Sequence, residues 1–573
     1  MRKLLSTTGW LVILLFACHN PKKATLSDAI SPYAYTTQKN VVATNGAVVS
    51  AHALASRTGL YILQKGGNAF DAAIATQLAL AVVYPNAGNL GGGGFLVARR
   101  ANGDLLSLDY REKAPAAAHR DMYLDADGKA RTDKSQYGHL SSGVPGTVAG
   151  LFETLPYARL PMADLVRPAI ELAKNGFVIS EREAAALNRL RGDLERYNTV
   201  PPVFLKDSPW KAGDTLVQKD LARTLERISE KGRDGFYKGE TARLIAEEMR
   251  RGGGIITEAD LAAYEARKRP PHQFSYKQYT IVSMPMPSSG GVLLHQMMKM
   301  IEEREIASMG FHSPASVQLM TEVQRRAFAD RGEYMGDADY FNVPVQMLTN
   351  PVYLQHKMKD FVPGKATPSH SVKPGYMVIP ESEETTHLSV IDKEGNAVAV
   401  TTTLNNSYGS RTVVGGAGFF LNDEMDDFSI KPGVPNMYGA IGAEANAIAP
   451  GKRMLSSMTP TLVLKNGGNY LVTGTPGGTT IPTQVFQTLV NILEFGLSAE
   501  DAVNKPKFHH QWIPDTLEVE KNFPQATREA LRQMGYILQQ RGAIGRTELI
   551  RVRPDGRFEA VADSRGEDAA EGF

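Results

Sequence analysis

The sequence is short of several features, and each shortage excludes a class of protein. It contains one cysteine, Cys18, in 573 residues, which excludes a disulfide framework and a cysteine-based zinc site. Neither sign of charge predominates, because 63 Lys and Arg residues stand against 61 Asp and Glu residues. Nothing therefore indicates a nucleic-acid-binding surface. Beyond residue 17, no apolar run reaches the roughly 20 residues that a membrane-spanning helix needs.

What is present is the composition of a globular protein, with 42% apolar and 22% charged residues. Helical periodicity and strand-like runs alternate along the chain. Expected helices cover residues 53–65, 69–83, 165–175, 181–190, 218–231, 239–251, 484–494, 498–504 and 525–534. Expected strands cover residues 41–50, 388–391, 397–404, 412–421, 461–465 and 470–473. This mixture favours layers of helix packed on sheet.

Residues 1–17 have the form of an export signal, in which Arg2 and Lys3 precede a short apolar run. The run ends in Leu15-Phe16-Ala17-Cys18, which resembles a bacterial lipoprotein signal whose cysteine becomes the lipidated first residue of the mature chain. An ordinary cleaved signal with an incidental cysteine is the alternative. We expect an exported, periplasmic protein with residues 18–39 as a tether, and on the first interpretation a lipid anchor at Cys18.

The glycine-rich stretch Gly88–Phe95 resembles a phosphate-binding loop only in composition. It lacks the Lys and Ser/Thr of a P-loop, and no GxGxxG pattern lies between a strand and a helix with a suitable acidic residue downstream. We expect these glycines to allow one backbone segment to pack closely against another.

The most informative stretch, residues 384–405, has the pattern of a β-hairpin. Lys393-Glu394-Gly395 fits a three-residue loop with glycine in the left-handed conformation. Extending the register outward from this loop places Thr385 opposite Thr403. Because directly opposed side chains share a face and lie within hydrogen-bonding reach, Thr385 is predicted to meet a second hydroxyl.

A threonine at the start of a strand, after a flexible linker, suits an N-terminal nucleophile. Threonine is a weak nucleophile unless a base takes its proton, and an α-amino group with a pKa of about 7.7–8.0 can be that base. Thr385 acquires this amine only if the bond after Glu384 is cut. Residues 363–384 are rich in Pro, Ser, Lys and Glu, and such a linker tolerates a cut. On spacing alone, two threonines that merely fill a sheet are the alternative.

Four motifs occur in order in the second half of the chain: Thr-Thr-His-x-Ser-Val from Thr385, Met-Asp-Asp-Phe-Ser from Met425, Leu-Ser-Ser-Met-x-Pro from Leu455 and Gly-x-Pro-Gly-Gly from Gly474. In them the sequence resembles the gamma-glutamyltransferases, which are self-cleaving N-terminal nucleophile hydrolases. The resemblance covers nearly the whole mature chain. It implies an α+β fold, the αββα four-layer sandwich. It also implies autocleavage between Glu384 and Thr385 into a large subunit, 40–384, and a small subunit, 385–573, which stay associated as a heterodimer.

The resemblance also implies the roles of individual residues. Thr385 resembles the nucleophile, first for autocleavage and then for the substrate, and Thr403 the hydroxyl that hydrogen-bonds it. Arg111, Ser456 and Ser457 resemble the residues that hold the α-carboxylate of the substrate. Asn405, Glu424 and Asp427 resemble those that hold its α-ammonium. Gly477 and Gly478 resemble the backbone that stabilises the oxyanion, and Tyr438 resembles the tip of a lid. Position 424 is Gln in some members, so a charge there alters the binding strength.

Taken alone, several of these residues have a plainer explanation. Arg111 could form an ion pair with the neighbouring Glu112, and Gly477-Gly478 could be a simple turn. Asp427 could belong to a turn or a helix cap. The adjacent pair His509-His510 is expected to be structural, because neighbouring residues on a strand point to opposite faces.

The implied activity is cleavage of the gamma-glutamyl amide bond of glutathione and related donors through a gamma-glutamyl-Thr385 ester. Water or an amino acid or peptide amine then accepts the glutamyl group, and no metal or organic cofactor is expected. One rival is a cephalosporin (glutaryl) acylase of similar architecture, which has no ammonium to hold, so Asn405, Glu424 and Asp427 favour the glutamyl donor. A second rival is a catalytically silent, surface-tethered binding protein, against which the intact Thr385, Thr403 and Gly477-Gly478 argue.

Overall fold

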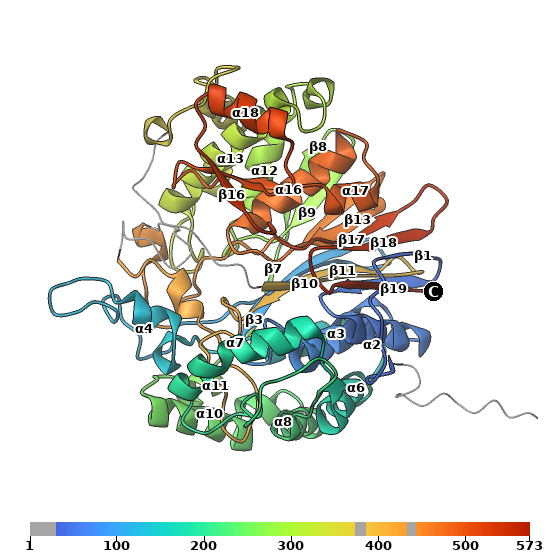
Figure 1. Ribbon diagram of the computed structural model, residues 1–573, viewed down its shortest axis with the longest axis vertical. Helices are drawn as coiled ribbons and strands as arrows, with labels where there is room; N and C mark the ends of the chain where they lie inside the picture. The colour runs from blue at the N-terminus through green and yellow to red at the C-terminus, as the bar shows by residue number, and fades with distance from the viewer. Residues whose placement is uncertain (1–29, 373–384, 432–442) are drawn as a thin grey trace, which may run out of the picture.

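Two seven-stranded antiparallel sheets lie face to face in the middle of the molecule (Figure 1). The computed structural model describes residues 30–372, 385–431 and 443–573. The first sheet, called here the hairpin sheet, has the order β19 (Ala569–Gly572), β2 (Gly46–Ser50), β10 (Thr385–Asp392), β11 (Ala397–Thr403), β3 (Gly93–Arg99), β4 (Leu105–Tyr110) and β7 (Arg267–Arg269). The second, the facing sheet, has the order β1 (Asn40–Ala43), β18 (Phe558–Ala562), β17 (Glu548–Val552), β13 (Gly468–Gly474), β12 (Thr461–Lys465), β9 (Tyr279–Ser283) and β8 (His272–Tyr276).

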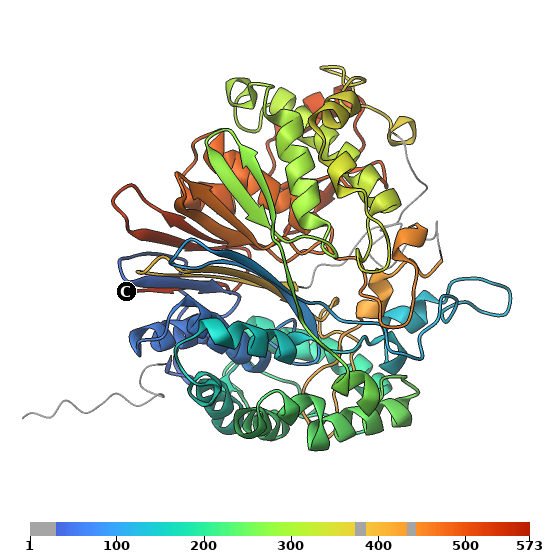
Figure 2. The same ribbon diagram turned by 180° about the vertical axis from the view of Figure 1, so that it is seen from behind.

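Helices cover the outer side of each sheet, and the view from behind shows the same layers (Figure 2). On the side of the hairpin sheet lie α2 (Ala53–Gln64), α3 (Ala69–Val83), α4 (Thr132–Gln136), α5 (Thr147–Thr154), α6 (Met162–Asn175), α7 (Glu181–Tyr197), α8 (Lys219–Lys231), α9 (Asp234–Tyr237), α10 (Gly239–Gly252) and α11 (Glu258–Ala262). On the side of the facing sheet lie α12 (Gly290–Ile301), α13 (Pro314–Tyr334), α14 (Val345–Leu348), α15 (Pro351–Lys357), α16 (Thr480–Leu493), α17 (Ala499–Asn504) and α18 (Gln525–Gln533). Two small sheets complete the described part, one of β14 (Phe508–His509), β15 (Leu517–Glu520) and β16 (Leu538–Arg541), the other of β5 (Phe177–Val178) and β6 (Thr215–Leu216).

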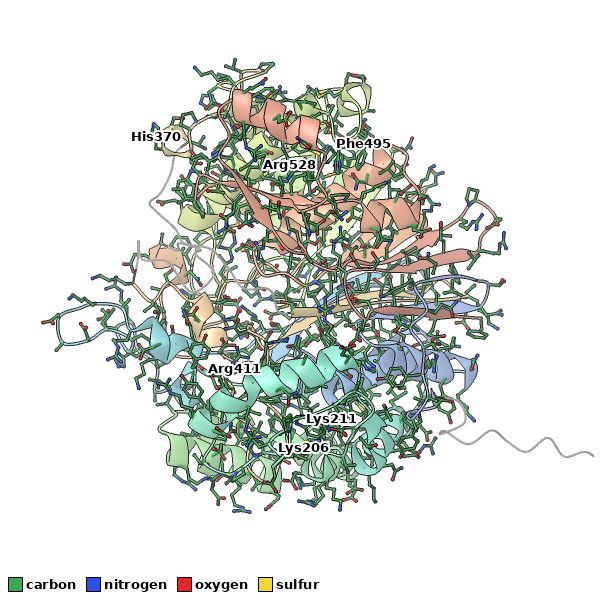
Figure 3. All side chains as sticks on the ribbon, viewed as in Figure 1. Lys206, Lys211, His370, Arg411, Phe495 and Arg528 are labelled. Atoms are coloured by element: carbon green, nitrogen blue, oxygen red, sulfur yellow. The ribbon has the colours of Figure 1, made fainter. Side chains whose placement is uncertain are left out.

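The central hairpin is buried on both faces, and its alternation divides the apolar core in two. Val390 and Val398 pack into the core shared with α2, α3 and α6. Ile391 and Ala399 pack into the core shared with the facing sheet and with α12 and α16. Since successive strand residues point to opposite faces, this double burial fixes the register of β10 and β11. Side chains fill the space between the ribbons of all layers (Figure 3).

The hairpin register predicted from the sequence is confirmed. Thr385 pairs with Thr403 at one end of the ladder and Ile391 with Ala397 at the other. Gly395 closes the loop with φ of 93°, in the left-handed region. The Asp392 carboxylate accepts a hydrogen bond of 2.8 Å from the Ala69 N–H at the start of α3, which ties the loop to the helix beneath it.

The glycine-rich stretch before β3 packs backbone against backbone, as expected. A Cβ added to Gly92 would lie 2.0 Å from the Thr403 carbonyl oxygen, and one added to Gly91 would lie 2.2 Å from that of Phe420. Real side chains do not fit at such distances, so glycine here lets β3 and its preceding loop approach the end of β11. The position of Thr403 depends on that close approach.

Two expectations about secondary structure need correction. Residues 412–421, predicted to form a strand, instead form a turn with isolated bridges, one between Val413 and Phe420 and one from Leu421 to Gly91. Glycines at 416 and 418 adopt φ of 75° and 82°, which breaks the extended conformation. The expected single strand over residues 41–50 is two strands, β1 and β2, which belong to different sheets.

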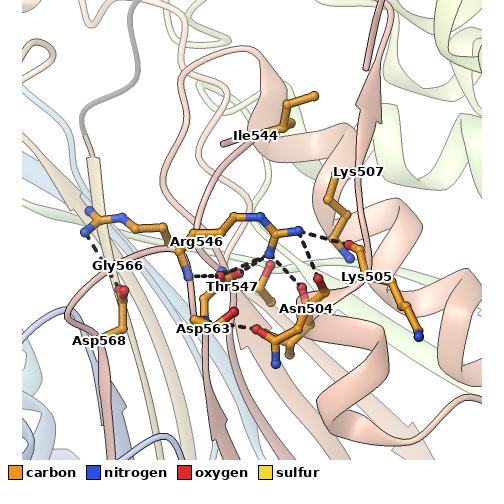
Figure 4. A network of polar contacts seen from close by, with 12 residues as sticks. Asn504, Lys505, Lys507, Ile544, Arg546, Thr547, Asp563, Gly566 and Asp568 are labelled. Atoms are coloured by element: carbon orange, nitrogen blue, oxygen red, sulfur yellow. Dashed lines mark hydrogen bonds and ion pairs between the residues drawn. The ribbon is translucent and has the colours of Figure 1, made fainter. Parts of the chain in front are cut away.

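The segment between β18 and β19 crosses from the facing sheet to the hairpin sheet and is held by a polar network (Figure 4). Arg565 donates to the Asp563 carboxylate at 3.0 Å and to the Lys505 carbonyl oxygen at 3.0 Å. Asp563 in turn accepts from the Thr547 N–H at 3.0 Å. These bonds hold the start of the crossing segment against the end of α17 and the start of β17.

Candidate active site

A small cavity of about 30 Å³ lies at the end of β10 and β11, where nine of the ten described candidate residues converge. It is lined by Arg111, Arg331, Thr385, Thr403, Asn405, Glu424, Asp427, Ser456, Ser457, Met458, Gly478, Thr479 and Ile481. The tenth candidate, Gly477, is the chain neighbour of Gly478. Three further candidates, Cys18, Glu384 and Tyr438, lie outside the described residues.

The two threonines form the hydroxyl side of the cavity. Thr385 and Thr403 are register partners on adjacent strands and are 4% and 2% exposed. The Thr403 hydroxyl oxygen accepts a 2.7 Å hydrogen bond from the Asn405 N–H. A hydroxyl that accepts one bond keeps its own hydrogen to donate, so Thr403 is prepared to donate toward Thr385.

Arg111 supplies a fixed positive charge beside the acidic residues of the cavity. It directly follows β4, and its N–H donates to the Asp109 carboxylate at 3.0 Å. Its guanidinium donates to the carboxylates of Glu424 and Asp427. Burial alone lowers the pKa of Arg111, but the surrounding carboxylates raise it above its ordinary value, so the group stays charged.

Three carboxyl groups surround the guanidinium of Arg111 on the acidic side of the cavity. Glu424 and Asp427 lie on a short 3₁₀ turn, and Glu112 lies 3.5 Å from the Arg111 guanidinium. Burial raises the pKa of Glu424 well above its ordinary value; Glu112 raises it further, whereas Arg111 lowers it. One buried oxygen of Glu424, Oε2, has no hydrogen-bond partner in the structure. A cationic donor such as an ammonium group fits this acceptor.

Gly477 and Gly478 lie between β13 and α16. Their φ values of 132° and 54° are in the region that favours glycine, and a Cβ on Gly477 would lie 2.5 Å from the Thr480 hydroxyl oxygen. The Gly477 carbonyl oxygen accepts from the Thr480 N–H at 2.9 Å, which fixes the turn onto the helix. Backbone N–H groups at a helix start lack partners within the helix and attract negative charge.

Two polar residues that line the cavity were not identified from the sequence. Arg331 comes from α13, and Thr479 donates to the Gln511 side chain. Thr479 follows Gly-x-Pro-Gly-Gly directly, so its proximity to that motif was an available signal. No comparable signal marks Arg331, which lies far from every motif in the sequence.

The His509-His510 pair lies outside the cavity. His509 contacts the Thr483 hydroxyl and the Gln511 side chain, each at 2.8 Å. His510 accepts from the Trp512 N–H at 3.0 Å. Burial lowers the pKa of both histidines to about 4, which keeps them neutral. Among the described residues, no group of three or more His, Cys, Asp or Glu side chains is arranged to hold a metal ion.

The fold, two facing antiparallel sheets covered by helices, matches solved structures of a gamma-glutamyltranspeptidase and a cephalosporin acylase. The family model described as Gamma-glutamyltranspeptidase matches residues 55–573. The glutathione hydrolase proenzyme of Escherichia coli K12 is 46% identical over 544 residues, 94% of each chain. The gamma-glutamyltranspeptidase of Helicobacter pylori superposes with a TM-score of 0.56 at 43% identity, covering 60% of this chain and 97% of that one. A cephalosporin acylase from Bacillus halodurans superposes with a TM-score of 0.80 at 25% identity, covering 94% and 98%.

The chain belongs to the gamma-glutamyltranspeptidase family.

Proposed function

We propose that this protein is a self-processing glutathione hydrolase and gamma-glutamyltransferase whose nucleophile is Thr385. The observation that carries the proposal is the convergence of Thr385 and Thr403 with one arginine, two acidic residues and two serines in a single buried cavity. The family match and the 46% identity to the E. coli proenzyme support the same activity.

We further propose that the fold is the αββα sandwich of N-terminal nucleophile hydrolases and that the chain is cut between Glu384 and Thr385. The strand order supports association of the two products. In the hairpin sheet, β10 and β11 of the proposed small subunit lie between β2 and β3 of the large one, and in the facing sheet β12 pairs with β9. A cut at residue 384 would leave these ladders intact, so subunits 40–384 and 385–573 would remain a heterodimer.

Binding of a gamma-glutamyl donor follows from the charges of the cavity. Its α-carboxylate pairs with the Arg111 guanidinium and accepts from Ser456 and Ser457. Its α-ammonium replaces Arg111 as a partner of the Glu424 and Asp427 carboxylates, with the Asn405 side chain as a further acceptor. A zwitterion therefore fits the site better than either charge alone, and the lid tip Tyr438 would close over it.

The chemical step uses the residues at the end of the hairpin. The Thr385 hydroxyl oxygen attacks the gamma-carbonyl carbon while the α-amine of Thr385 takes the hydroxyl proton. The N–H groups of Gly477 and Gly478 stabilise the oxyanion. Collapse breaks the amide bond, the amine of Thr385 returns the proton to the leaving nitrogen, and a gamma-glutamyl-Thr385 ester remains. Water or an acceptor amine resolves the ester, and no step needs a metal or an organic cofactor.

Glutaryl amides are the substrates of the rival acylase activity, and the acidic side of the cavity disfavours them. A glutaryl group carries the carboxylate but no ammonium, so binding it would leave the buried Glu424 and the half-buried Asp427 without a cationic partner from the substrate. The excess of carboxylates over Arg111 therefore supports the glutamyl donor.

The proposed location is the periplasm, with the chain exported by residues 1–17 and anchored through a lipid on Cys18. The support is the sequence pattern alone. Metabolic labelling with a fatty acid should mark the wild-type protein, and Cys18→Ser should abolish the label. Absence of label on the wild type would leave a cleaved soluble form and refute the anchor.

The activity is tested by comparing matched donors. The purified protein should release glutamate from glutathione and p-nitroaniline from gamma-glutamyl-p-nitroanilide. It should hydrolyse glutaryl-p-nitroanilide at least about a hundredfold less efficiently, because Glu424 and Asp427 then gain no cationic partner from the substrate. Preference for the glutaryl compound, or no turnover of gamma-glutamyl donors, would contradict the proposal.

A further inference from the structure

Arg331 is a second guanidinium in the cavity, and no motif or assigned role accounts for it. It lies near the C-terminal end of α13, and the residue is 8% exposed. Its Nη2 donates to the Ser457 hydroxyl oxygen at 3.0 Å, and its Nε donates to the Ser289 hydroxyl oxygen at 3.1 Å. One side chain thus links a proposed carboxylate-binding serine to the loop that precedes α12.

That loop, residues 285–289, holds the segment of Ser456 from the other side. The Ser456 N–H donates to the Pro287 carbonyl oxygen at 2.9 Å. The Ser456 carbonyl oxygen accepts from both the N–H and the hydroxyl of Ser289, each at 2.8 Å. The Ser288 hydroxyl donates to the Met458 carbonyl oxygen at 2.6 Å. Residues before the proposed cleavage site therefore fix the backbone of serines that come after it.

The direction of these hydrogen bonds decides what the two serines can do. Arginine has donors only, so Ser457 must accept from Arg331 and keeps its hydroxyl hydrogen for another partner. The Ser456 hydroxyl oxygen likewise accepts from the Met458 N–H at 3.2 Å. Both hydroxyls are thereby prepared as donors, which is what a carboxylate requires.

Arg331 also acts on the acidic side of the cavity. Burial raises the pKa of Asp427, and the charges of Arg111 and Arg331 both lower it. When a substrate carboxylate forms an ion pair with Arg111, the positive charge of Arg331 remains near Asp427 and favours the ionised form of Asp427.

We infer that Arg331 is a positioning residue for substrate recognition. Arg331, itself held by the Ser289 hydroxyl, orients the Ser457 hydroxyl to donate to the α-carboxylate of the gamma-glutamyl donor. The inference rests on the proposed function and deepens it. It assigns to Arg331 a share in selecting donors that carry an α-carboxylate, and none in the attack of Thr385.

The test compares two p-nitroanilides, gamma-glutamyl and 4-aminobutyryl, which differ only by the α-carboxylate. In Arg331→Met and Arg331→Lys, KM for the gamma-glutamyl donor should rise about 10- to 100-fold, with kcat changed less than about threefold, because the lost contact binds ground and transition states alike. In Arg331→Lys, which keeps the positive charge near Asp427, the efficiency toward the 4-aminobutyryl donor should stay within about twofold of wild type. Arg331→Lys keeps the charge but not the two-pronged contact, so it serves also where Arg331→Met fails to mature.

Arg326→Lys is the matched control. Arg326 is on the same helix and is also buried, but it pairs with Glu322 and with Asp360 at 2.6 Å, about 140° around the helix from Arg331. The Arg326→Lys variant should leave the ratio of the kcat/KM values for the two donors unchanged, even if its stability is altered.

A double variant provides the decisive comparison. Arg331→Lys added to Ser457→Ala should cost less than about twofold beyond Ser457→Ala alone, because the charge is kept and the lost contact acts through that hydroxyl. Equal loss with both donors, or multiplicative losses in the double variant, would overturn the inference. Failure of the proposed function is distinguishable, since the wild type would then turn over no gamma-glutamyl donor at all.

Discussion

The two halves of the active site are built in different ways. The nucleophile half, Thr385 and Thr403, lies on paired strands and contains neutral hydroxyls placed by a backbone ladder. The binding half, Arg111, Glu424 and Asp427, lies at a strand end and on a short turn, and its side chains hold one another through charge. The backbone hydrogen bonds of the ladder do not depend on the ionisation of side chains. The side-chain contacts of the binding half do depend on it, and on the charges of the substrate. Loss of turnover should therefore follow changes in the first half, and loss of affinity changes in the second.

Thr385→Ala should have the largest effect. Without the hydroxyl, neither the self-cleavage nor the acyl transfer has a nucleophile, so activity should fall by roughly 10⁴-fold or more and the chain should stay uncut. Activity assays and a denaturing gel measure both. Thr385→Ser, which keeps hydroxyl and amine, is the control and should still be cut.

Arg111→Lys should have the second-largest effect on activity, through the binding half of the site. Lysine keeps the charge but cannot pair with a carboxylate through two parallel bonds, so kcat/KM should fall about a hundredfold or more. Initial-rate kinetics should show the loss chiefly in KM. A loss confined to kcat would erase the distinction between the two halves.

Thr403→Val should weaken the nucleophile half without touching substrate charge. Removing the hydroxyl takes a donor from Thr385 and leaves the Asn405 N–H without its 2.7 Å acceptor. We expect kcat to fall about 10- to 100-fold with KM little changed. Thr403→Ser should recover most of the rate, and its failure to do so would point to a packing role.

Glu424→Gln should sharpen the comparison through pH. Burial raises the pKa of Glu424, so the carboxylate that binds the ammonium is lost as pH falls through a range above that of an exposed carboxyl. The acidic limb of kcat/KM should therefore move to lower pH in the variant, with an efficiency only about threefold lower at the optimum. An acidic limb that does not move would exclude Glu424 as its source.

His387→Gln should change stability and not recognition. Burial lowers the pKa of His387 to about 3, so the folded protein keeps it neutral while the unfolded chain protonates near pH 6.5. The stability that the neutral form allows is present above about pH 6.5 and is lost as pH falls below it. Between pH 7 and pH 5 the free energy of unfolding should fall by about 2 kcal/mol less in the variant than in the wild type. Thermal unfolding at both pH values measures this difference.

The nucleophile half was predictable because its information is local. A three-residue loop closed by Gly395 fixes the pairing of Thr385 with Thr403, which each lie nine positions from Glu394 at the centre of the loop. The structure has that pairing. The binding half required the family motifs, because Arg111 and Glu424 meet only through the packing of distant loops.

Arg331 could not have been found from periodicity, for a physical reason. Helix α13 is buried without interruption from Ser316 to Arg331, so its polar residues lie inside the molecule and show no apolar stripe. The prediction of a strand over residues 412–421 was wrong for another reason. Their apolar side chains favoured a strand, but Gly416 and Gly418 at positive φ turn the backbone.

The account depends most directly on where the mature small subunit begins. N-terminal sequencing and intact-mass measurement of the shorter chain in the purified, active protein should give a start at Thr385. An active enzyme that is one continuous chain, or whose shorter chain begins at another residue, would contradict the central claim.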